Sequence, residues 1–428
     1  MEIYQVPAIS APVQGIVKVP GSKSITNRAL LLAALADGTT ILTNTLFSED
    51  ANYFLNCLKA LGFTISVDMA NHSVEVVGCN GKIPKKEAGI YVGSAGTAAR
   101  FLTAMLGLSD GIYEISSSEQ MEKRPMKPLF LLLEQLGAEI TYLKDTYHLP
   151  IKIKGISIRD QKQISLDISK STQFLSALLL VAPLFPKGAE IQITGDKKNG
   201  SYVEITRKMI DSFGGETVFD GSCYKIAPKT VYQKKEYSIE PDVSAACYFY
   251  GIAAITGGQV TVENVRLSMM QGDLRFLEVL KEMGCRVEES GMGVTVTGPN
   301  DRILKEIEVD MNNFSDQALT LAAIAPFAEH PVTIRNIEHI RHQECDRMRA
   351  MEVNLTRAGI RTQVEKDKIV ICPGTPSACK IETFEDHRVA MAFSLLGLRA
   401  EGIEILNPSC CKKTFPEFFS VLEKLIKV

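Results

Sequence analysis

The chain repeats itself at intervals of about 72 residues, and this period limits the possible folds more than any other feature of the sequence. Polar or glycine- and serine-rich loops lead into segments of small apolar residues that begin near positions 24, 96, 171, 242, 315 and 386. The spacings between these starts are 72, 75, 71, 73 and 71 residues. A helix that is apolar on all sides is normally buried. The sequence therefore predicts six buried helices, one in each repeat.

A second element recurs in the same frame. An amphipathic helix ends at an apolar residue, and the residue that follows is Gly62, Gly137, Gly214, Gly284 or Gly359. Glycine is favoured after a last helical turn, because the backbone there turns left-handed. Alternating apolar residues then predict a strand–turn–strand. The sixth copy ends early, and we expect residues 14–21 (QGIVKVPG) to supply its missing strand.

Six units of this size predict two domains of three units each. Turn-forming residues near Pro20–Ser22 and Tyr237–Asp242 mark the two points where the chain should cross between domains. We therefore expect one discontinuous domain of residues 1–21 and 240–428, and a second domain of residues 22–239.

The charge balance excludes some classes of partner. Lys and Arg number 47 and Asp and Glu 50, for a net charge of −3, so the chain is no nucleic-acid binder that relies on bulk positive charge. Its mostly apolar stretches are about a dozen residues long, too short to span a bilayer. Ten cysteines without a CxxC pair, and an N-terminus unlike a secretory signal, predict a cytoplasmic protein with reduced thiols.

Charged and polar residues gather at the starts of the predicted buried helices. Helix N-termini attract anions, because their free N–H groups and positive dipole end point outward. Ser, Thr and Asp at such positions are also ordinary caps. A cation opposes the dipole, however, so Lys23, Arg28, Arg100 and Arg388 indicate that an anion binds near these helix starts.

Six separate segments resemble, in order, the signatures of the 5-enolpyruvylshikimate-3-phosphate synthase family. They are Pro20–Ala36 (PGSKSITNRALLLAALA), Gly93–Arg100 (GSAGTAAR), Lys123–Met126 (KRPM), Glu344–Arg347 (ECDR), Asp386–Met391 (DHRVAM) and Lys413–Pro416 (KTFP). The resemblance implies an α/β, two-domain enolpyruvyl transferase fold. In it, six βαβαββ-type repeats, three per domain, place buried helices inside and sheets outside. This agrees with the repeat count obtained from the period alone.

The resemblance also implies an activity. The family transfers the enolpyruvyl group of phosphoenolpyruvate to the 5-hydroxyl of shikimate 3-phosphate and releases phosphate, a step of chorismate synthesis. Its partners are these two small molecules, with no nucleic acid and no membrane. The resemblance implies no metal and no organic cofactor, and it implies a monomer.

Residue roles follow from the resemblance position by position. The residues expected to bind phosphoenolpyruvate are Lys23, Gly96, Arg124, Gln173, Arg347, Arg388 and Lys413. Those expected to bind shikimate 3-phosphate are Lys23, Ser24, Arg28, Ser171, Thr172, Gln173, Ser201, Tyr202, Asp316, His339 and Gln343. Arginine suits such ligands, because its planar fork grips a carboxylate or phosphate with two hydrogen bonds.

The expected catalytic residues are Asp316, Glu344 and Lys23. Asp316 resembles the family's proton acceptor for the 5-hydroxyl group. Glu344 and Lys23 are candidates for proton transfer at C3 and to the leaving phosphate. The sequence leaves open which of the three handles which proton.

The chain departs from the family pattern at three positions. Gln343 stands where the family has lysine, and His339 where it has asparagine; both positions should lie on the shikimate 3-phosphate side. Glutamine keeps a hydrogen-bond donor but lacks the charge. Phe101 replaces a common proline, and the neighbouring Arg100 is expected to anchor the glycine-rich loop.

Two other interpretations were weighed. The UDP-N-acetylglucosamine enolpyruvyl transferases share the fold, but they carry a Lys-Asn pair near the N-terminus and a loop cysteine. This chain has Lys23-Ser24, and no cysteine between Cys79 and Cys223. A non-catalytic repeat scaffold that binds anions is the other alternative. Asp316 and Glu344 argue against it, because a pure anion binder gains nothing from carboxylates among its cations.

Overall fold

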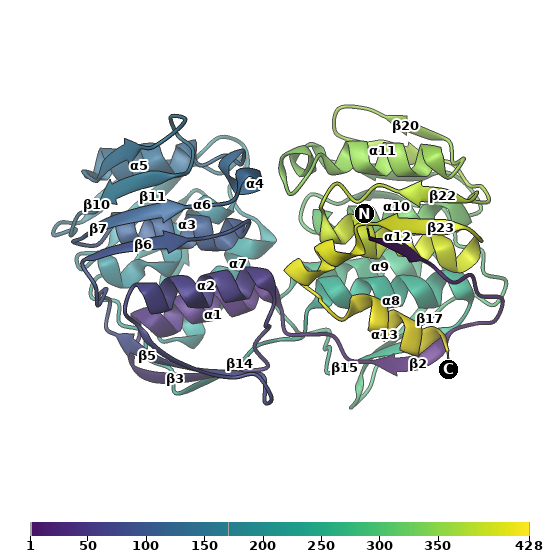
Figure 1. Ribbon diagram of the computed structural model, residues 1–428, viewed down its shortest axis with the longest axis horizontal. Coiled ribbons are helices and arrows are strands. Elements are labelled where there is room, and N and C mark those ends of the chain that lie inside the picture. Colours follow the sequence, from purple (N-terminus) through teal and green to yellow (C-terminus); the bar gives the residue numbers. More distant parts are fainter. Residues whose placement is uncertain (1, 170, 428) are drawn as a thin grey trace. The chain divides into compact units, whose positions relative to one another are not determined.

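A computed structural model describes residues 2–169 and 171–427 of the chain (Figure 1). The chain forms two compact units. Unit 1 comprises residues 1–20 and 241–428, and unit 2 comprises residues 21–240. Each boundary lies one residue from the position expected from the turn signals.

Each repeat contains one helix that is buried on all or nearly all sides. In α3 and α8 every residue is buried, as their uniformly small and apolar sequences predict. The six buried helices are α1 (Lys23–Leu35), α3 (Gly96–Gly107), α6 (Gln173–Leu180), α8 (Val243–Thr256), α10 (Ala318–Ile324) and α12 (His387–Arg399).

Two of these helices are shorter than the sequence pattern suggests. After α6 and α10 the chain continues as the 3₁₀ turns η1 (Ala182–Leu184) and η4 (Ala325–Phe327), which contain Pro183 and Pro326. Proline lacks the amide N–H and clashes with the preceding turn, so it ends a regular helix.

The amphipathic helices end as predicted. The glycine after each of the first five has a positive φ between 76° and 109°, the left-handed conformation expected at this position. These helices are α2 (Glu49–Ala60), α5 (Lys127–Leu136), α7 (Ser201–Ser212), α9 (Arg275–Glu282), α11 (Arg347–Arg357) and the last helix α13 (Phe418–Ile426). The remaining short helices and turns are α4 (Glu119–Glu122), η2 (Gly272–Leu274), η3 (Ser315–Gln317), η5 (Glu338–His342) and η6 (Pro408–Lys413).

Three four-stranded sheets belong to unit 2. Their orders are β14-β3-β5-β4, β6-β7-β9-β8 and β10-β11-β13-β12. In each sheet the first two strands pair in parallel, and the others extend the sheet as an antiparallel hairpin. The strands are β3 (Asp37–Thr43), β4 (Thr64–Asp68), β5 (Ser73–Cys79), β6 (Glu87–Tyr91), β7 (Ile112–Ser116), β8 (Glu139–Tyr142), β9 (Ile151–Lys154), β10 (Lys162–Asp167), β11 (Ala189–Thr194), β12 (Thr217–Phe219), β13 (Cys223–Ile226) and β14 (Glu236–Ser238).

Unit 1 holds two sheets of the same design and one of three strands. Their orders are β2-β15-β17-β16, β18-β19-β21-β20 and β22-β23-β1. The strands are β1 (Ile3–Gln5), β2 (Gln14–Val17), β15 (Gln259–Glu263), β16 (Arg286–Glu289), β17 (Gly293–Thr297), β18 (Glu308–Asp310), β19 (Val332–Arg335), β20 (Thr362–Val364), β21 (Ile369–Ile371), β22 (Cys379–Ile381) and β23 (Ile403–Leu406).

The strands before α1 and α8 are exchanged between the two units. β2 precedes α1 in the chain but pairs in parallel with β15, which follows α8. β14 precedes α8 but pairs in parallel with β3, which follows α1. At the crossings, the Asp242 amide donates to Pro20 in unit 1 and the Ser22 amide donates to Glu240 in unit 2, both at 2.8 Å.

The prediction for the sixth repeat was wrong in one respect. Its missing strand is β1 (Ile3–Gln5), antiparallel to β23, and not the segment 14–21. The reason is strand direction. The missing strand must run antiparallel to its neighbour, as β1 does beside β23. β2 instead runs parallel to its neighbour, like every strand that precedes a buried helix.

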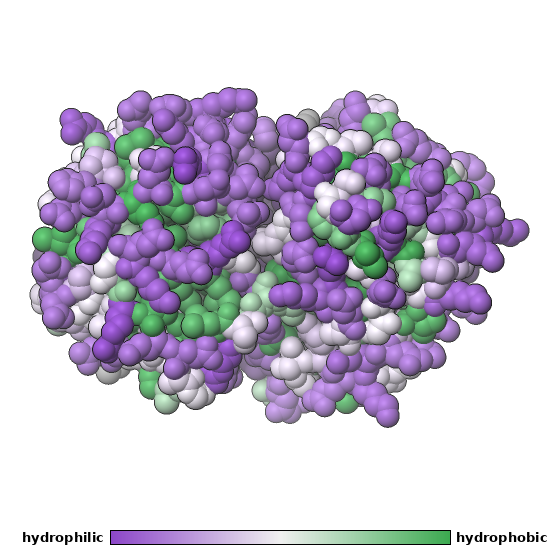
Figure 2. All heavy atoms as spheres, turned by 180° about the vertical axis from the view of Figure 1, so that it is seen from behind, coloured by the Kyte–Doolittle hydropathy of each residue, from purple (hydrophilic) through white to green (hydrophobic). Residues whose placement is uncertain are grey.

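The outer surface of each unit is mostly polar. Hydrophilic side chains cover most of the face seen in Figure 2, with apolar side chains scattered between them. Among the described residues, no helix has both the length and the apolar character needed to cross a membrane.

Candidate functional site

Arg347, the first residue of α11, is the centre of a buried ion-pair network in unit 1. Its Nε donates to Asp386 Oδ2 at 2.8 Å, Nη1 to Asp316 Oδ1 at 2.8 Å, and Nη2 to Glu344 Oε2 at 3.0 Å. Burial alone would lower the pKa of this guanidinium. The attraction of Asp386, Glu344 and Asp316 outweighs burial and raises the pKa above its ordinary value. The structure therefore holds Arg347 as a permanent cation.

Asp316 lies between two guanidinium groups. Its second oxygen accepts from Arg388 Nη2 at 3.0 Å, while the first is bound to Arg347. Arg388 is fixed in turn at the start of α12, where its amide donates to the capping carboxylate of Asp386 at 2.9 Å. Two consecutive repeats thus meet in this network, at η3 just before α10 and at the starts of α11 and α12.

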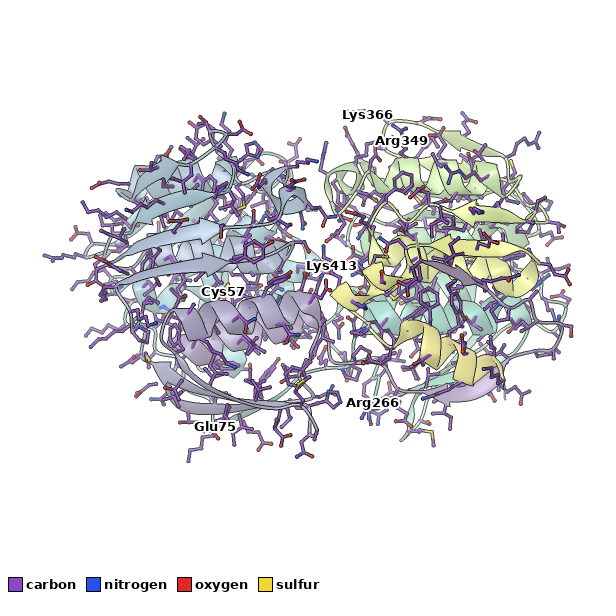
Figure 3. All side chains as sticks on the ribbon, in the orientation of Figure 1. Cys57, Glu75, Arg266, Arg349, Lys366 and Lys413 are labelled. Atoms are coloured by element: carbon purple, nitrogen blue, oxygen red, sulfur yellow. The ribbon has the colours of Figure 1, made fainter. Side chains whose placement is uncertain are left out.

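Lys413 and Glu344 extend this network. Lys413 ends η6 in the C-terminal segment (Figure 3), and its Nζ lies 3.9 Å from Glu344 Oε1. Both side chains are largely buried, with exposed fractions of 6% and 12%. The turn η6 packs against α12, so Lys413 and Arg388 are held by neighbouring elements.

The two residues that depart from the family pattern also lie in unit 1. Gln343 accepts a hydrogen bond from Arg347 Nη1 through its side-chain oxygen. His339 Nε2 lies 2.8 Å from Ser315 Oγ, one residue before Asp316. Both residues therefore contact the network or the turn that carries its central carboxylate.

Arg28 plays a different role at the centre of unit 2. It is buried, and its Nε donates to Thr206 Oγ1 at 2.8 Å. Its Nη atoms donate to the backbone oxygens of Ser24 at 3.0 Å and Tyr202 at 3.2 Å, and to Ser176 Oγ at 3.4 Å. These contacts join α1, α6 and α7, and every partner is neutral.

Two aromatic rings complete the surroundings of Arg28. Its guanidinium lies 5.2 Å from the ring centre of Phe101 and 5.7 Å from that of Tyr202. Burial lowers the pKa of Arg28 to about 10. No carboxylate pairs with this cation within residues 2–169 and 171–427, so its charge is offset only by dipoles and ring faces.

A second arginine of unit 2 ties the glycine-rich loop together. Arg100 Nη1 donates to Gln173 Oε1 at 2.7 Å and to the Gly96 oxygen at 3.4 Å, and Nη2 donates to the Pro125 oxygen at 3.2 Å. This confirms that Arg100 anchors the loop. A Cβ atom at Gly96 would lie 2.7 Å from Nη1 of both Arg100 and Arg124. A side chain at this position would displace both guanidinium groups, and glycine leaves room for them.

Lys23, the first residue of α1, forms an ion pair in unit 2. Its Nζ lies 3.2 Å from Asp50 Oδ2, and Asp50 is buried in the first turn of α2. One turn along α1, Asn27 Nδ2 donates to Thr97 Oγ1 at 2.7 Å and joins the starts of α1 and α3.

The remaining predicted residues of unit 2 lie at two helix starts. Ser171 Oγ accepts from the Gln173 amide at 3.3 Å, and Thr172 occupies the position just before α6. Ser201 is the first residue of α7, next to Tyr202. The sequence-predicted residues therefore form one cluster in unit 1 and another around the starts of α1, α3, α6 and α7 in unit 2.

Sequence reasoning missed the carboxylates that hold these cations. Asp386 was part of a recognised motif but had no assigned role, and Asp50 was not considered. Asp273 and Ser244, a buried pair beside Arg388, were missed as well. The available signal was an acidic residue in or just before the first turn of a helix, which is also the pattern of ordinary caps and dipole partners.

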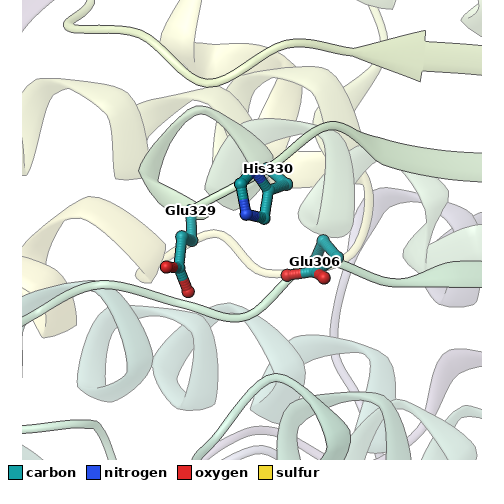
Figure 4. A group of neighbouring side chains, drawn as sticks. All are labelled: Glu306, Glu329 and His330. Carbon is teal, nitrogen blue, oxygen red and sulfur yellow. The ribbon is translucent and has the colours of Figure 1, made fainter.

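One group outside the two clusters places possible metal ligands together. Glu306, Glu329 and His330 bring ligand atoms within 4.8 Å of one another (Figure 4). All three side chains are exposed on the surface. Exposed acidic groups of this kind are common, so the group carries no argument for a bound ion.

The architecture is that of the enolpyruvyl transferases. The enolpyruvyl transferase NikO from Streptomyces tendae has the same fold, with a TM-score of 0.77 at 15% identity over 99% of this chain and 97% of that one. An EPSP synthase from Acinetobacter baumannii is more similar, with a TM-score of 0.83 at 25% identity, covering 99% and 98%.

Sequence comparison identifies the family within this class. The family model of EPSP synthase (3-phosphoshikimate 1-carboxyvinyltransferase) matches residues 7–422, and the chain belongs to this family. A 3-phosphoshikimate 1-carboxyvinyltransferase of Trichormus variabilis is 42% identical over the full length of both chains. The chloroplastic enzyme of Arabidopsis thaliana is 39% identical over 97% of this chain and 83% of its own length.

Proposed function

We propose that this protein is a 3-phosphoshikimate 1-carboxyvinyltransferase. It transfers the enolpyruvyl group of phosphoenolpyruvate to the 5-hydroxyl of shikimate 3-phosphate and releases phosphate. The observation that carries the proposal is the position of Asp316, a carboxylate held between Arg347 and Arg388 in a network that also contains Glu344 and Lys413. Such a set combines anion-binding groups with groups that can exchange protons.

Both substrates carry a phosphate and a carboxylate, so their sites need fixed positive charge. We assign phosphoenolpyruvate to residues that donate through guanidinium, ammonium, amide or backbone N–H groups. They are Lys23, Gly96, Arg124, Gln173, Arg347, Arg388 and Lys413. The rigid link between Arg100 and Gln173 supports this assignment, because it fixes one of these donors before the ligand arrives.

Shikimate 3-phosphate is assigned chiefly to the helix starts of unit 2. The residues proposed to bind it are Lys23, Ser24, Arg28, Ser171, Thr172, Gln173, Ser201, Tyr202, Asp316, His339 and Gln343. The uncompensated charge of Arg28 supports this assignment, because an anion nearby would stabilise a buried cation that has only neutral partners.

The reaction is an addition followed by an elimination. The 5-hydroxyl oxygen adds to C2 of phosphoenolpyruvate while C3 takes a proton, and loss of phosphate and of a C3 proton restores the double bond. We propose Asp316 as the acceptor of the hydroxyl proton. Hydrogen bonds from Arg347 and Arg388 hold its two oxygens in place, and a carboxylate held in this way can act as a general base.

Glu344 and Lys23 are proposed to handle the protons at C3 and on the leaving phosphate. Glu344 is bound to Arg347 and lies near Lys413, two residues proposed to hold phosphoenolpyruvate, which supports a role close to the reacting carbon. Lys23 is paired with Asp50, which fixes its ammonium group beside the start of α1.

The decisive experiment measures phosphate release from phosphoenolpyruvate with two acceptors in parallel. Shikimate 3-phosphate should support turnover, and UDP-N-acetylglucosamine should support none. Turnover with the sugar nucleotide alone would favour the other transferase family. Absence of turnover with either acceptor, from a folded protein, would favour a scaffold that only binds anions.

We further propose that the protein acts as a monomer in the cytoplasm. All ten cysteines are free, which suits a reducing compartment. Light scattering coupled to size-exclusion chromatography tests the monomer directly, and a mass near 94 kDa instead of 47.0 kDa would contradict it.

A further inference from the structure

A buried carboxylate that the proposed mechanism does not use lies behind Arg388. Asp273 belongs to η2, just before α9, and is 7% exposed. Ser244, in the first turn of α8, donates its hydroxyl hydrogen to Asp273 Oδ2. Arg388 Nη2 approaches the oxygen of the same hydroxyl at 3.5 Å and also donates to Asp316 at 3.0 Å. One serine hydroxyl thus connects Asp273 to the arginine.

The turn that carries Asp273 is fastened to the start of α8. Gln271 Oε1 accepts from the Val243 amide at 3.0 Å, and Gln271 Nε2 donates to the Pro241 oxygen at 2.7 Å. The Cys247 thiol lies 3.7 Å from the Asp273 backbone oxygen. These contacts hold the Asp273 carboxylate in place from its own backbone, so its position does not depend on Arg388.

We propose that Asp273 is a positioning residue that sets, through Ser244, how strongly Arg388 binds an anionic substrate. This inference rests on the proposed function, in which Arg388 holds phosphoenolpyruvate. Arg388 already forms an ion pair with Asp316. A second carboxylate nearby would further reduce the attraction between Arg388 and an anionic ligand.

The charge of Asp273 has a clear direction of effect. An ionised carboxylate attracts Arg388 through the serine and repels the anion that Arg388 would bind. A protonated carboxyl group removes both effects, so Arg388 then attracts the ligand more strongly. Asn at this position imitates the protonated form, because it is neutral and still accepts a hydrogen bond from Ser244.

The surroundings place this protonation in an accessible pH range. The charged and titratable groups around Asp273 are Asp316 of η3, Arg388 of α12, and Asp242 and Cys247 at the start of α8. Burial and the negative charge of Asp316 raise the pKa of Asp273 to about 7, against the opposing effects of Arg388 and the Ser244 hydroxyl. The charge on Asp273 should therefore change between pH 6 and 8.

The test is the pH dependence of KM for phosphoenolpyruvate at saturating shikimate 3-phosphate, between pH 5.5 and 8.5, in parent and Asp273→Asn. The ratio of the two KM values cancels the titration of the ligand itself. We expect the KM of the parent divided by the KM of the variant to rise by roughly fivefold to tenfold as the pH increases through about 7. This is the order of magnitude expected for one buried charge near the ligand. The kcat at pH 6 should stay within about threefold.

Two further variants test the link and the charge separately. Ser244→Ala removes the hydroxyl through which Asp273 acts on Arg388, so most of the pH dependence of KM seen in the parent should be lost. Asp242→Asn keeps a good helix cap and removes a negative charge that raises the pKa of Asp273, so the transition should shift to lower pH. A residue with a merely structural role would produce neither result.

The outcomes distinguish a failure of the proposed function from a failure of the proposed role of Asp273. A parent enzyme without turnover contradicts the proposed function itself. An active parent whose KM ratio to Asp273→Asn is flat from pH 5.5 to 8.5 overturns the role of Asp273. If Asp273→Asn fails to fold, as judged by thermal melting, the loss of the transition in Ser244→Ala and its shift to lower pH in Asp242→Asn still decide, and parent-like profiles in both variants would overturn the proposal.

Discussion

The two units hold their arginines in opposite ways. In unit 1, Arg347 binds three carboxylates and Arg388 binds one of the same three, so positive charge is matched by negative charge. In unit 2, Arg28 is equally buried, and among the described residues its hydrogen bonds go only to hydroxyl groups and backbone oxygens. The same repeat unit, used in both halves, thus builds a charge-matched network in one half and a charge-unmatched arginine in the other.

This difference suggests a division of labour within the proposed function. An unmatched cation gains most from an anionic ligand, so Arg28 suits permanent recognition of a phosphate or carboxylate. A matched network responds to a ligand by redistributing charge and protons, so the cluster around Asp316 suits chemistry. Five substitutions test this comparison, in order of the expected effect.

The largest effect is expected for Asp316→Ala. Loss of a general base typically reduces turnover by about 10²- to 10⁴-fold. Turnover at saturating substrates should fall by that order while the circular dichroism spectrum stays close to that of the parent; the melting temperature should fall, because Arg347 and Arg388 lose a shared carboxylate. Turnover within a few-fold of the parent would remove Asp316 from the chemistry.

The comparison is tested most directly by replacing each central arginine with methionine. Arg347→Met leaves three carboxylates without their shared cation and should lower the free energy of unfolding by about 3–5 kcal/mol. Arg28→Met leaves only neutral groups without a donor and should cost about 1–3 kcal/mol. Urea unfolding of both variants measures the difference. Equal losses would mean that the charge matching in unit 1 adds nothing to stability.

Gly96→Ala tests the spacing of cations in unit 2. The added methyl group would push against the guanidinium groups of Arg100 and Arg124, and small misplacements of binding groups cost up to about 10²-fold. We expect KM for phosphoenolpyruvate to rise about 10-fold or more, while KM for shikimate 3-phosphate changes little. Equal effects on both substrates would indicate a general disturbance of the loop.

The smallest effect is expected for Gln343→Lys, which restores the family's residue. In this structure Gln343 accepts from Arg347, and a lysine would place a second cation beside that arginine. Loss of one hydrogen bond predicts a decrease of about 1 kcal/mol in the free energy of unfolding. Calorimetry with shikimate 3-phosphate between pH 5.5 and 8.5 provides the second measurement. Tighter binding by the variant would show that position 343 touches this substrate.

Much of the fold was predictable because short local residue patterns specify each helix and its end, and these patterns recur in each repeat. The apolar segments near 96 and 242 became helices buried on every side, and Gly62, Gly137 and their equivalents took the left-handed backbone that their position required. The exchange of β2 and β14 and the pairing of β1 with β23 were not predictable in detail. Short strands have similar sequences, and only strand direction in the folded sheet distinguishes their places.

The sequence predicted where the charged residues gather, but not which carboxylate pairs with which cation. Lys23, Arg28 and Arg388 were found from their places at predicted helix starts, and Arg347 from its place in a family motif. Which carboxylate holds which arginine depends on side chains that are distant in the chain, such as Asp386 and Arg347, 39 residues apart. The sequence alone also contains no sign that Arg28 would be left without a carboxylate, because its partners are backbone oxygens and hydroxyl groups.

The exchanged strands have a consequence for the order in which the protein folds during synthesis. Unit 2 has all of its strands once residue 240 has left the ribosome, because β14 is the last strand that it needs. The first strands made, β1 and β2, find their partners in β23 and β15, which are translated later. At roughly 5–20 residues per second, the remaining 188 residues (428 − 240) take on the order of 10–40 s. β1 must therefore stay without its partner until β23 has been synthesised, so unit 2 can fold while unit 1 still lacks a strand.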